Sequence, residues 1–528
     1  MREKFRRIWA LALVLILVTG VGFLFSCRKQ GMFIDEIYTY GLSNSSYRPF
    51  LSGLKYQSID HSLFTREELL DYVSITGDEG FDFASVYYNQ VHDVHPPLYY
   101  WLFNIASTFA RGSFSKWTGL VLDWLIYLGC VLMLYALVRK LGGSRYNAAA
   151  AGVLYGLSVI GLSTMVMIRM YVLLTFLTIV LAYFIACLMR EFRRSTCVFV
   201  GLTLLAGLMT QYYFVFYAFF LCAAYVLWAL LRKEYRALAW FVPCALAGAL
   251  ALLLVFPAAL THLFSGELVS GESAMDNLKN FAQYPARMRV FVGQARHGLK
   301  AAIFTGLAAL AALAVFFRRV RAVGKEGRLR PDWLVLILPA FVTFVLVAII
   351  SPVDEARYIY NLIPILVLTV SFLLYLLETA LEDSPRKRQL SAVLFLAVAL
   401  LALWEARSAP PDYLYPEHAE YNAQLAAHRD DPCVFFADPE WAFVPMTEDL
   451  IQLLIFPEVY VTDDKNFDGM LTYVGDADEV VVYIDISEFW SSGYDAEEIL
   501  ARLAAETDFR TAVPLFETGL STTWLISR

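Results

Sequence analysis

The chain has 528 residues, of which 59% are hydrophobic and 17% charged, and its mean hydropathy is +0.55. With its repeated uncharged runs of about twenty residues, this composition excludes a soluble globular protein and predicts a polytopic membrane protein. Residues 410–528 hold 24 acidic and 5 basic side chains, a balance of −19. Because the whole chain carries −7, the remainder carries −7 + 19, or +12. The acidic segment is not expected to bind nucleic acid or anionic lipid.

The first apolar run covers residues 8–26 and follows a basic stretch from Arg2 to Arg7. Its length of about nineteen residues favours a membrane anchor over a cleaved signal peptide, whose apolar core is usually about 7–15 residues. A long loop, residues 27–117, comes next and contains the apolar run Pro97–Ala110. That run is too short to cross a hydrocarbon core of about 30 Å at 1.5 Å per residue, so we expect an interfacial helix.

Six basic clusters separate the apolar runs, and the positive-inside rule places all of them in the cytoplasm. The number of spans between neighbouring clusters must then be even. We therefore predict about eleven transmembrane helices, with the N-terminus in the cytoplasm and the C-terminal region outside. The predicted spans are residues 8–26, 118–138, 147–166, 171–189, 197–209, 212–231, 238–260, 299–317, 333–350, 358–377 and 392–403.

Two domains are expected, a transmembrane domain over 1–407 that includes the first loop, and an acidic soluble α/β domain over 408–528. The second domain has neither a glycine-rich phosphate loop nor a histidine cluster, so we interpret it as a positioning or acceptor-side module. Alternating and helical patterns predict strands at Cys433–Phe436, Glu458–Val461, Val480–Ile486 and Ser521–Ile526, and a helix at Ala496–Glu506.

The seven cysteines show no metal-ligand spacing, and five of them fall in or beside apolar runs. Cys27 and Cys433 are expected outside the membrane, but their distance in sequence gives no geometric reason to pair them. We therefore predict no disulfide framework. No cofactor is indicated, although a divalent metal is left open.

Asp35 and Glu36 are adjacent carboxylates about eight residues beyond the first apolar run. Neighbouring carboxylates near a membrane surface can differ in pKa, so that one acts as a base while the other orients a partner. The alternative is a solvated turn, which is the usual explanation for an acidic pair in a loop. Because the pair follows an anchoring span, we favour Asp35 as the catalytic base and Glu36 as an assisting or orienting group.

His92, Asp93 and His95 stand before two prolines at the start of the short apolar run. The prolines favour an extended backbone ahead of a helix. Three-residue spacing in an extended segment rarely brings two imidazoles to one ion, so we predict no metal here. We interpret His95 as an orienting side chain and keep Asp93 as a candidate site residue.

Arg169 and Arg357 each begin an outward-facing helix beside a tyrosine, Tyr171 and Tyr358 respectively. A planar guanidinium next to an aromatic ring at the outer interface suits a lipid-borne phosphate. The alternative is ordinary interfacial anchoring by Arg and Tyr. Asp123 lies inside a predicted span, where a carboxylate is costly, so we expect it to face the site or to pair with an arginine.

Five motifs on the predicted outer side together resemble the type C membrane glycosyltransferases (GT-C), over roughly residues 1–380. Within these enzymes, the protein O-mannosyltransferase and aminoarabinose transferase group, with its bacterial relatives, is the most similar. The motifs are Asp35-Glu36, Asp93-Val94-His95-Pro96-Pro97-Leu98, Arg169-Met170-Tyr171, Thr210-Gln211-Tyr212-Tyr213, and Arg357-Tyr358 followed by Pro364.

The resemblance implies a lipid-phosphate sugar donor, an inverting transfer outside the cytoplasm and the first-loop acid as catalyst. This chain departs from the family pattern at Met167, where relatives often have an acid, and at Gln211, where they often have a histidine, so the acceptor stays open. The implied donor-binding residues are His95, Arg169, Tyr171, Gln211, Tyr212, Arg357 and Tyr358.

These observations predict a glycosyltransferase of the bacterial plasma membrane. It would move a hexosyl or pentosyl group from a polyprenyl-phosphate donor to a lipid, glycan or protein acceptor on the extracytoplasmic face. The alternatives are a polytopic lipid or glycan transporter or flippase, and a non-catalytic export scaffold. A transporter would be expected to carry charges at mid-bilayer, broken helices and a repeat relating two halves.

Overall fold

The computed structural model divides the chain into two compact units, one made of membrane helices and one that contains a β-sheet. Unit 1 comprises Met1–Cys27, Val94–Tyr99 and Leu120–Asp412, and unit 2 comprises Arg28–Asp93, Tyr100–Gly119 and Tyr413–Arg528. The structure describes residues 2–54, 62–77, 79–264, 275–325, 330, 332–381, 386–465, 467–487 and 493–528.

Eight helical segments in the described part of the chain are long and apolar enough to cross a membrane. The shortest has 18 residues, which at 1.5 Å per residue reach about 27 Å, close to the roughly 30 Å of a hydrocarbon core. They are α1 (Arg2–Arg28), α6 (Lys116–Leu141), α9 (Tyr171–Arg190), α11 (Phe214–Leu231), α12 (Tyr235–Val255), α18 (Asp332–Ile350), η2 with α19 (Ala356–Leu362 and Ile363–Ala380) and α20 (Lys387–Ser408).

Two bent pairs of helices raise the number of candidate spans to ten if each pair is one span. The first pair, α7 (Arg145–Gly156) and α8 (Val159–Val166), meets at 62°. At this bend Ser158 accepts the backbone N–H of Gly161 at 3.1 Å and so caps the new helix.

The second bent pair is the helical stretch Phe281–Gly298, made of η1 (Phe281–Gln283) and α15 (Tyr284–Gly298), with α16 (Lys300–Val315). It turns by 86°. Glu405 of α20 accepts the backbone N–H groups of Lys300 at 3.2 Å and Ala301 at 2.6 Å, which satisfies the exposed start of α16. A buried carboxylate thus stabilises the break.

The polytopic helical fold is confirmed, with eight to ten candidate spans among the described residues where about eleven were predicted. The predicted spans 147–166 and 299–317 fall in the two bent pairs, and two others differ clearly in length. The run at 197–209 is α10 (Arg194–Leu208), whose 15 residues rise only about 22 Å. It packs closely against α12, because a Cβ on Gly201 would lie 2.5 Å from the carbonyl oxygen of Cys244. The run at 392–403 belongs to the 22-residue α20, which extends through charged residues at its ends.

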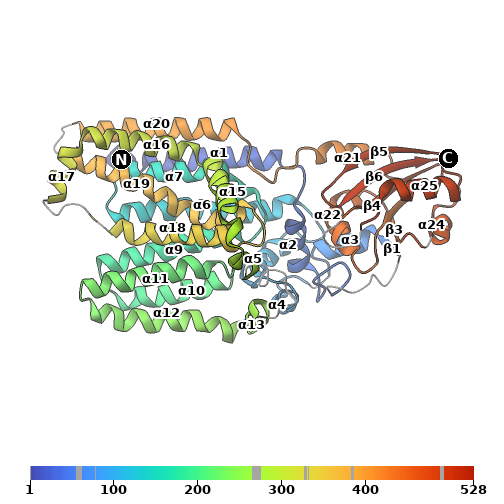
Figure 1. The fold of residues 1–528 in the computed structure, drawn as a ribbon, viewed down its shortest axis with the longest axis horizontal. Coiled ribbons are helices and arrows are strands. Elements are labelled where there is room, and N and C mark those ends of the chain that lie inside the picture. Colours follow the sequence, from blue (N-terminus) through green and yellow to red (C-terminus); the bar gives the residue numbers. More distant parts are fainter. Residues whose placement is uncertain are drawn as a thin grey trace. The chain divides into compact units, whose positions relative to one another are not determined.

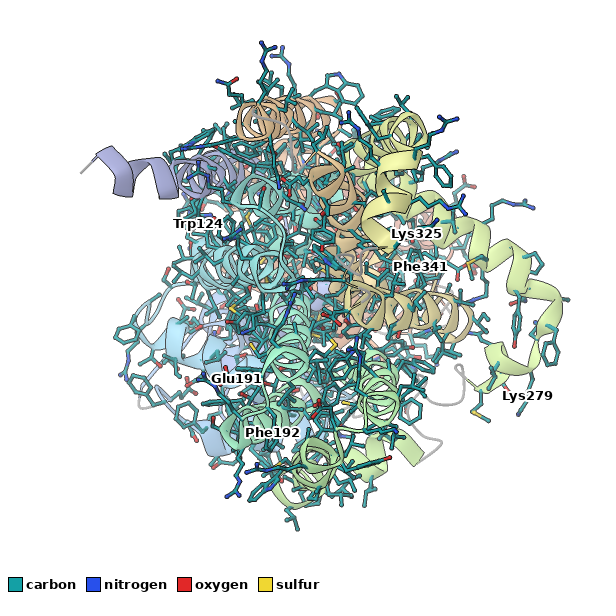
Figure 2. All side chains as sticks on the ribbon, turned by 90° about the vertical axis from the view of Figure 1, so that its left-hand side faces the viewer. Trp124, Glu191, Phe192, Lys279, Lys325 and Phe341 are labelled. Carbon is teal, nitrogen blue, oxygen red and sulfur yellow. The ribbon has the colours of Figure 1, made fainter. Side chains whose placement is uncertain are left out.

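The connections of unit 1 differ at the two ends of its helices. In Figure 1, α17 (Phe317–Lys325) and the turn between α11 and α12 lie at the left-hand ends, whereas α13 (Ala259–Phe264) lies at the right. Figure 2 looks at the left-hand end, where Glu191 and Phe192 mark the turn between α9 and α10, and Lys325 marks α17. The basic clusters at these three connections therefore share one end of the helices, as their predicted common side requires.

The first loop folds into short helices within unit 2. These are α2 (Ile34–Asn44), α3 (Arg66–Val73), α4 (Phe83–Val91) and α5 (Leu98–Thr108), the last beginning in unit 1. The 11 residues of α5 rise only about 16 Å, which agrees with the short helix predicted for this run. Tyr72 of α3 packs under Gly41 of α2, where an added Cβ would lie 2.1 Å from the Tyr72 ring.

A six-stranded sheet forms the centre of unit 2, with strand order β1-β3-β2-β4-β6-β5 (Figure 1). Strand β2 pairs in parallel with β3 and β4, while β1, β6 and β5 are antiparallel to their neighbours. The strands are β1 (Leu63–Thr65), β2 (Cys433–Phe436), β3 (Glu458–Thr462), β4 (Glu479–Asp485), β5 (Thr511–Glu517) and β6 (Ser521–Ser527).

Helices complete unit 2, and the central strand β2 is buried along its whole length. Val434, Phe436 and Val482 of the central strands pack with Met470 of α24 and Leu503 of α25 in one apolar core. The helices are α21 (His418–Ala426), α22 (Phe443–Glu448), α23 (Leu450–Leu453), α24 (Phe467–Val474) and α25 (Ala496–Glu506).

The predicted boundary between the domains is corrected in one respect. We expected the first loop to belong to the transmembrane domain, but Leu63, Phe64 and Thr65 of that loop pair with β3 of the C-terminal segment. Most of the loop therefore belongs to the same compact unit as residues 413–528. A three-residue strand gives no visible alternation in sequence, which is why the pattern missed it.

Candidate active site

The two acids of the Asp35-Glu36 pair occupy the first turn of α2, but Glu36 is fully buried. Its Oε2 atom lies 2.9 Å from Nζ of Lys29, which is also fully buried, and it accepts the backbone N–H of Phe33 at 2.6 Å. A buried carboxylate in an ion pair, which also caps its own helix, is held in one position. These contacts fix the position of the Glu36 carboxylate.

Asp35 has a more open environment, because its side chain is partly exposed. The backbone carbonyl of Asp35 accepts the hydroxyl of Thr39 at 3.0 Å, which fixes the first turn. The unpaired N–H groups at a helix N-terminus carry partial positive charge and stabilise a carboxylate there. Asp35 is therefore the more exposed member of the pair.

The segment that contains Asp93 and His95 crosses the boundary between the units, since unit 2 ends at Asp93 and unit 1 resumes at Val94. Asp93 is half-buried in the turn after α4, where its N–H donates to the carbonyl of Gln90 at 3.3 Å. His95 belongs to unit 1, with most of the predicted donor-binding residues.

Arg169 is 3% exposed in the tight turn between α8 and α9. Its N–H donates to the carbonyl of Met167 at 2.8 Å, and its Nη2 atom lies 3.5 Å from Nδ1 of His95. The structure thus brings together two predicted donor-binding residues that are 74 positions apart. A guanidinium this buried requires polar or anionic partners.

The short helix η2 connects the predicted motifs of unit 1 through aromatic contacts. Tyr171, at the start of α9, meets Tyr360 of η2 edge-on, with ring centroids 6.1 Å apart. Tyr213, just before α11, packs against Tyr358 of η2 at 5.2 Å. Three of the resembling motifs therefore converge on η2, which also packs against α8, α9 and α18.

Arg357 lies at the start of η2, and its side chain is 11% exposed. Its Nε atom is 3.0 Å from a carboxylate oxygen of Glu355, and its guanidinium lies 5.6 Å from the ring centre of Tyr358. The ion pair orients the planar group, and the ring supports one of its faces. Arg357 and Arg169 are the two predicted phosphate ligands.

The turn that precedes α11 holds the remaining predicted residues, Gln211 and Tyr212. Gln211 is 6% exposed, and its carbonyl accepts the N–H of Phe214 at 3.1 Å. The hydroxyl of Tyr212 lies 2.9 Å from Nδ1 of His262, which is 5% exposed in α13. The sequence analysis did not identify His262 as a candidate site residue. Only its position just after an apolar run distinguishes it in the sequence.

Asp123 is fully buried in α6, and its Oδ1 atom accepts the hydroxyl of Tyr99 at 2.8 Å. Tyr99 follows His95 by four residues, so this hydrogen bond fixes the segment that carries a predicted donor-binding histidine. Asp123, buried among the membrane helices, thus helps to hold that segment in place.

A second residue that sequence reasoning missed is Arg287 of α15, which is 8% exposed. Its guanidinium lies 3.1 Å from a carboxylate oxygen of Asp354 and donates to the hydroxyl of Ser351 at 2.8 Å. It therefore ties α15 to the connection between α18 and η2. Its signal was weak, because it lies in the long connection between the predicted spans 238–260 and 299–317.

Unit 2 contains a separate buried acid, Asp449, at the start of α23. Its Oδ2 atom accepts the hydroxyl of Ser521 at 2.5 Å, and the side chain is fully buried. Burial raises the pKa of Asp449 to about 8, and the neighbouring Glu448 carboxylate adds to the increase. This acid joins α23 to β6 in the protonated form near neutral pH.

Stability should depend on pH through Asp449. In the unfolded chain the Asp449 carboxyl group has its ordinary pKa of 3.8, whereas in the folded protein its pKa is about 8. Between pH 3.8 and pH 8 the folded state therefore binds a proton that the unfolded state has lost. The contribution of Asp449 is fully present below about pH 3.8 and is lost as pH rises through 8. Asp449→Asn should flatten the decline in unfolding temperature between pH 5 and about 8. Identical slopes for variant and wild type would exclude this contribution.

Chemically, the residues around η2 suit an anion bound beside an apolar chain. Two largely buried guanidinium groups offer forked donors, those of Arg169 beside His95 and of Arg357 beside Tyr358. Within the described part of unit 1, this is the place where most of the resembling motifs meet. Asp35, Glu36 and Asp93 lie in unit 2.

The fold is similar to those of several solved membrane enzymes. ArnT from Cupriavidus metallidurans, bound to undecaprenyl phosphate, matches with a TM-score of 0.51 and 13% identity over 98% of both chains. The archaeal oligosaccharyltransferase AglB from Archaeoglobus fulgidus, in complex with an inhibitory peptide and a dolichol-phosphate, matches at 0.49 and 11% identity, over 94% of this chain and 72% of AglB. Arabinofuranosyltransferase AftD from Mycobacteria matches at 0.46 and 15%, over 97% and 40%. No protein-family model and no curated protein matches the sequence.

At 13% sequence identity, the similarity to ArnT shows a shared fold and not a shared function. The match to ArnT covers 98% of both chains, so it includes the helices of unit 1 and the sheet-containing unit 2. The chain therefore shares its fold with ArnT.

Proposed function

We propose that this protein transfers a sugar from a polyprenyl-phosphate donor to an acceptor on the extracytoplasmic face of the plasma membrane, with inversion at the anomeric carbon. The N-terminus would lie in the cytoplasm and residues 413–528 outside. The acceptor would be a lipid, a glycan or a protein. The observation that carries the proposal is that the segments before α9 and α11 meet η2 through the ring contacts Tyr171–Tyr360 and Tyr213–Tyr358, in a fold shared with ArnT.

The reaction explains why two arginines are needed. When the acceptor oxygen attacks the anomeric carbon, the bond from that carbon to the phosphate oxygen breaks. The phosphate changes from a singly charged diester to a monoester whose charge grows by one unit. Arg169 and Arg357 would therefore bind the transition state more strongly than the donor, which is the requirement for catalysis. No general acid is needed, because the leaving phosphate is already a stable anion.

Asp35 would accept the proton that the acceptor hydroxyl or amine loses. Its partly exposed position in the first turn of α2 supports this role. Glu36, fixed by Lys29 and by the Phe33 N–H, would position the turn. His95, Tyr171, Gln211 and Tyr212 would line the donor site, and Asp93 stays a further candidate.

Replacing Arg357 by lysine should weaken binding of undecaprenyl phosphate by about ten- to hundredfold, because the charge is kept but the forked pair of donors is lost. Titration of the purified full-length protein, followed by its intrinsic fluorescence, gives the affinity. Arg296→Lys, at an exposed position of α15, is the matched control and should bind like the wild type. Wild-type affinity in both Arg357→Lys and Arg357→Ala would reassign Arg357 to anchoring at the interface.

Mass spectrometry of cell-envelope glycans, with and without the protein, tests the proposed function. Loss of one sugar substituent from one acceptor, restored by the wild-type gene and not by the Asp35→Asn form, is the expected result. A flippase would instead deplete a whole class of lipid-linked glycan outside the membrane, and the Asp35→Asn form would restore it.

A further inference from the structure

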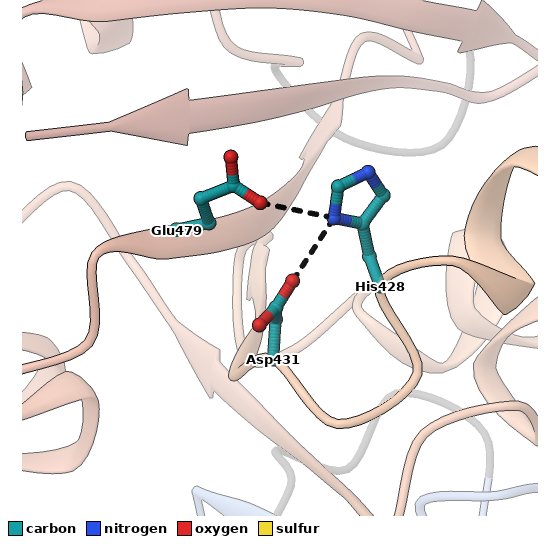
Figure 3. Close-up of side chains that lie close together, drawn as sticks. All are labelled: His428, Asp431 and Glu479. Atoms are coloured by element: carbon teal, nitrogen blue, oxygen red, sulfur yellow. Dashed lines mark hydrogen bonds and ion pairs between the residues drawn. The ribbon is translucent and has the colours of Figure 1, made fainter.

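Three potential metal ligands from two separate segments converge in unit 2 (Figure 3). His428 and Asp431 lie in the turn between α21 and β2, and Glu479 is the first residue of β4. The Nδ1 atom of His428 is 2.9 Å from Oδ2 of Asp431 and 3.3 Å from Oε2 of Glu479. Among the residues that the structure describes, this is the one group in which three such ligand atoms lie within 4.8 Å of one another.

A simple ion pair does not explain why two carboxylates approach the same nitrogen of His428. One imidazole nitrogen holds at most one proton and so donates at most one full hydrogen bond, yet two carboxylate oxygens approach the same nitrogen. The two carboxylates also repel each other unless a cation lies close to both. A metal ion would accept electron pairs from all three atoms at once.

The separations match the edges of a metal coordination shell. With metal–ligand bonds of about 2.1 Å, neighbouring ligand atoms lie about 3.0 Å apart in an octahedron and about 3.4 Å apart in a tetrahedron. The two distances from His428, 2.9 and 3.3 Å, fall close to this range. One imidazole and two carboxylates form a donor set that suits zinc or manganese.

The surroundings favour capture of a cation. The side chains of His428, Asp431 and Glu479 are 20%, 33% and 45% exposed, so an ion can enter and water can complete its shell. The segment 410–528 carries 24 acids against 5 bases, which raises the local concentration of cations. The neighbouring Arg429 points a guanidinium nitrogen to Asp430, at 3.5 Å, rather than filling the site with its own charge.

We propose that His428, Asp431 and Glu479 form a site for a divalent transition metal, zinc or manganese, that fastens the α21–β2 turn to β4. The turn matters because its residue Arg429 and the preceding Ala426, the last residue of α21, also line a pocket of about 600 Å³. Arg66, Leu70 and Phe114 form other parts of that pocket's wall. The metal would thus stabilise one wall of a cavity in unit 2.

The test uses the purified full-length protein in detergent, first treated with a chelator. Isothermal titration with Zn²⁺ or Mn²⁺ should show one site per chain and a rise in unfolding temperature that saturates with the metal. His428→Ala and Glu479→Gln should each weaken binding at least tenfold. His297→Ala, an exposed histidine of α15, should bind like the wild type. Co²⁺ should give a visible absorption band in the wild type that His428→Ala lacks.

Three results would overturn the proposal. The first is no saturable binding to the wild type, and the second is equal affinity in wild type and Glu479→Gln. The third is a stability difference between wild type and His428→Ala that is the same with chelator and with metal, which would leave only an ion pair. Glu479→Gln keeps the test decisive if His428→Ala does not fold, because Glu479 lies half-exposed at a strand end.

Discussion

Asp35→Asn should lower the rate of sugar transfer by about 10²–10⁴-fold and leave the affinity for undecaprenyl phosphate unchanged. Asparagine keeps the size of the side chain and much of its hydrogen bonding, but it has no basic oxygen to accept the acceptor's proton. The unchanged affinity follows because Arg169 and Arg357, the proposed phosphate ligands, are not altered. Initial rates of transfer and a binding titration on the same preparation give the two quantities.

The control for this change is Asp476→Asn, which neutralises an exposed carboxylate of unit 2 and should keep the wild-type rate. A pH profile separates loss of a base from loss of structure. If Asp35 is the base, the wild-type rate falls at low pH as the carboxylate is protonated, and the residual rate of Asp35→Asn does not follow that fall. A wild-type rate in Asp35→Asn would refute the assignment.

Removing one partner of the buried Lys29–Glu36 pair should cost roughly 3–5 kcal/mol of stability, because the other charge stays buried and uncompensated. Both side chains are fully buried and their charged atoms are 2.9 Å apart. Lys29 also donates to the carbonyl of Tyr413 at 2.5 Å, so the pair joins the start of α2 to the C-terminal segment of the same unit. Lys29→Met and Glu36→Gln are the two single changes.

A double-mutant cycle measures this coupling. The double variant Lys29→Met/Glu36→Gln should recover much of the stability lost by Lys29→Met, since no unpaired charge then remains. The matched control is the pair Arg193–Glu191, whose charged atoms are 2.8 Å apart but whose side chains are about two-thirds exposed. Its removal should not measurably change the unfolding temperature. Additive losses in the buried pair would mean that the two residues stabilise the fold independently.

The membrane helices could be predicted from sequence because a helix in lipid needs a long apolar run, and basic clusters mark the cytoplasmic connections between such runs. The strands β2, β3, β4 and β6 and the helix α25 were also predicted, the helix with its observed bounds. Strand β5 was missed because most of its residues are exposed and Pro514 interrupts its pattern. The pairing of β1 with β3 is a contact across some 400 residues, which no local pattern encodes.

For the candidate site, the sequence indicated which residues to consider and not which of them meet. Arg169 and His95 are brought together by the fold, and so are Tyr213 and Tyr358. His262 and Arg287 were missed because a single histidine or arginine in a long connection has no distinctive spacing. The difference in surroundings between Asp35 and Glu36 could not be predicted from the sequence. Lys29, the partner of Glu36, resembles an ordinary basic residue at the end of a span.

The most direct test of the proposed function is release of free polyprenyl phosphate by the purified protein in sealed vesicles. The donor is a polyprenyl phosphate that carries a labelled sugar, and the acceptor is a glycan or lipid fraction supplied on the face where residues 413–528 are exposed. We predict that polyprenyl phosphate and labelled acceptor appear in equal amounts, and that neither appears with Asp35→Asn. Movement of intact sugar-lipid across the bilayer, with no polyprenyl phosphate released, would contradict the proposal and identify a transporter.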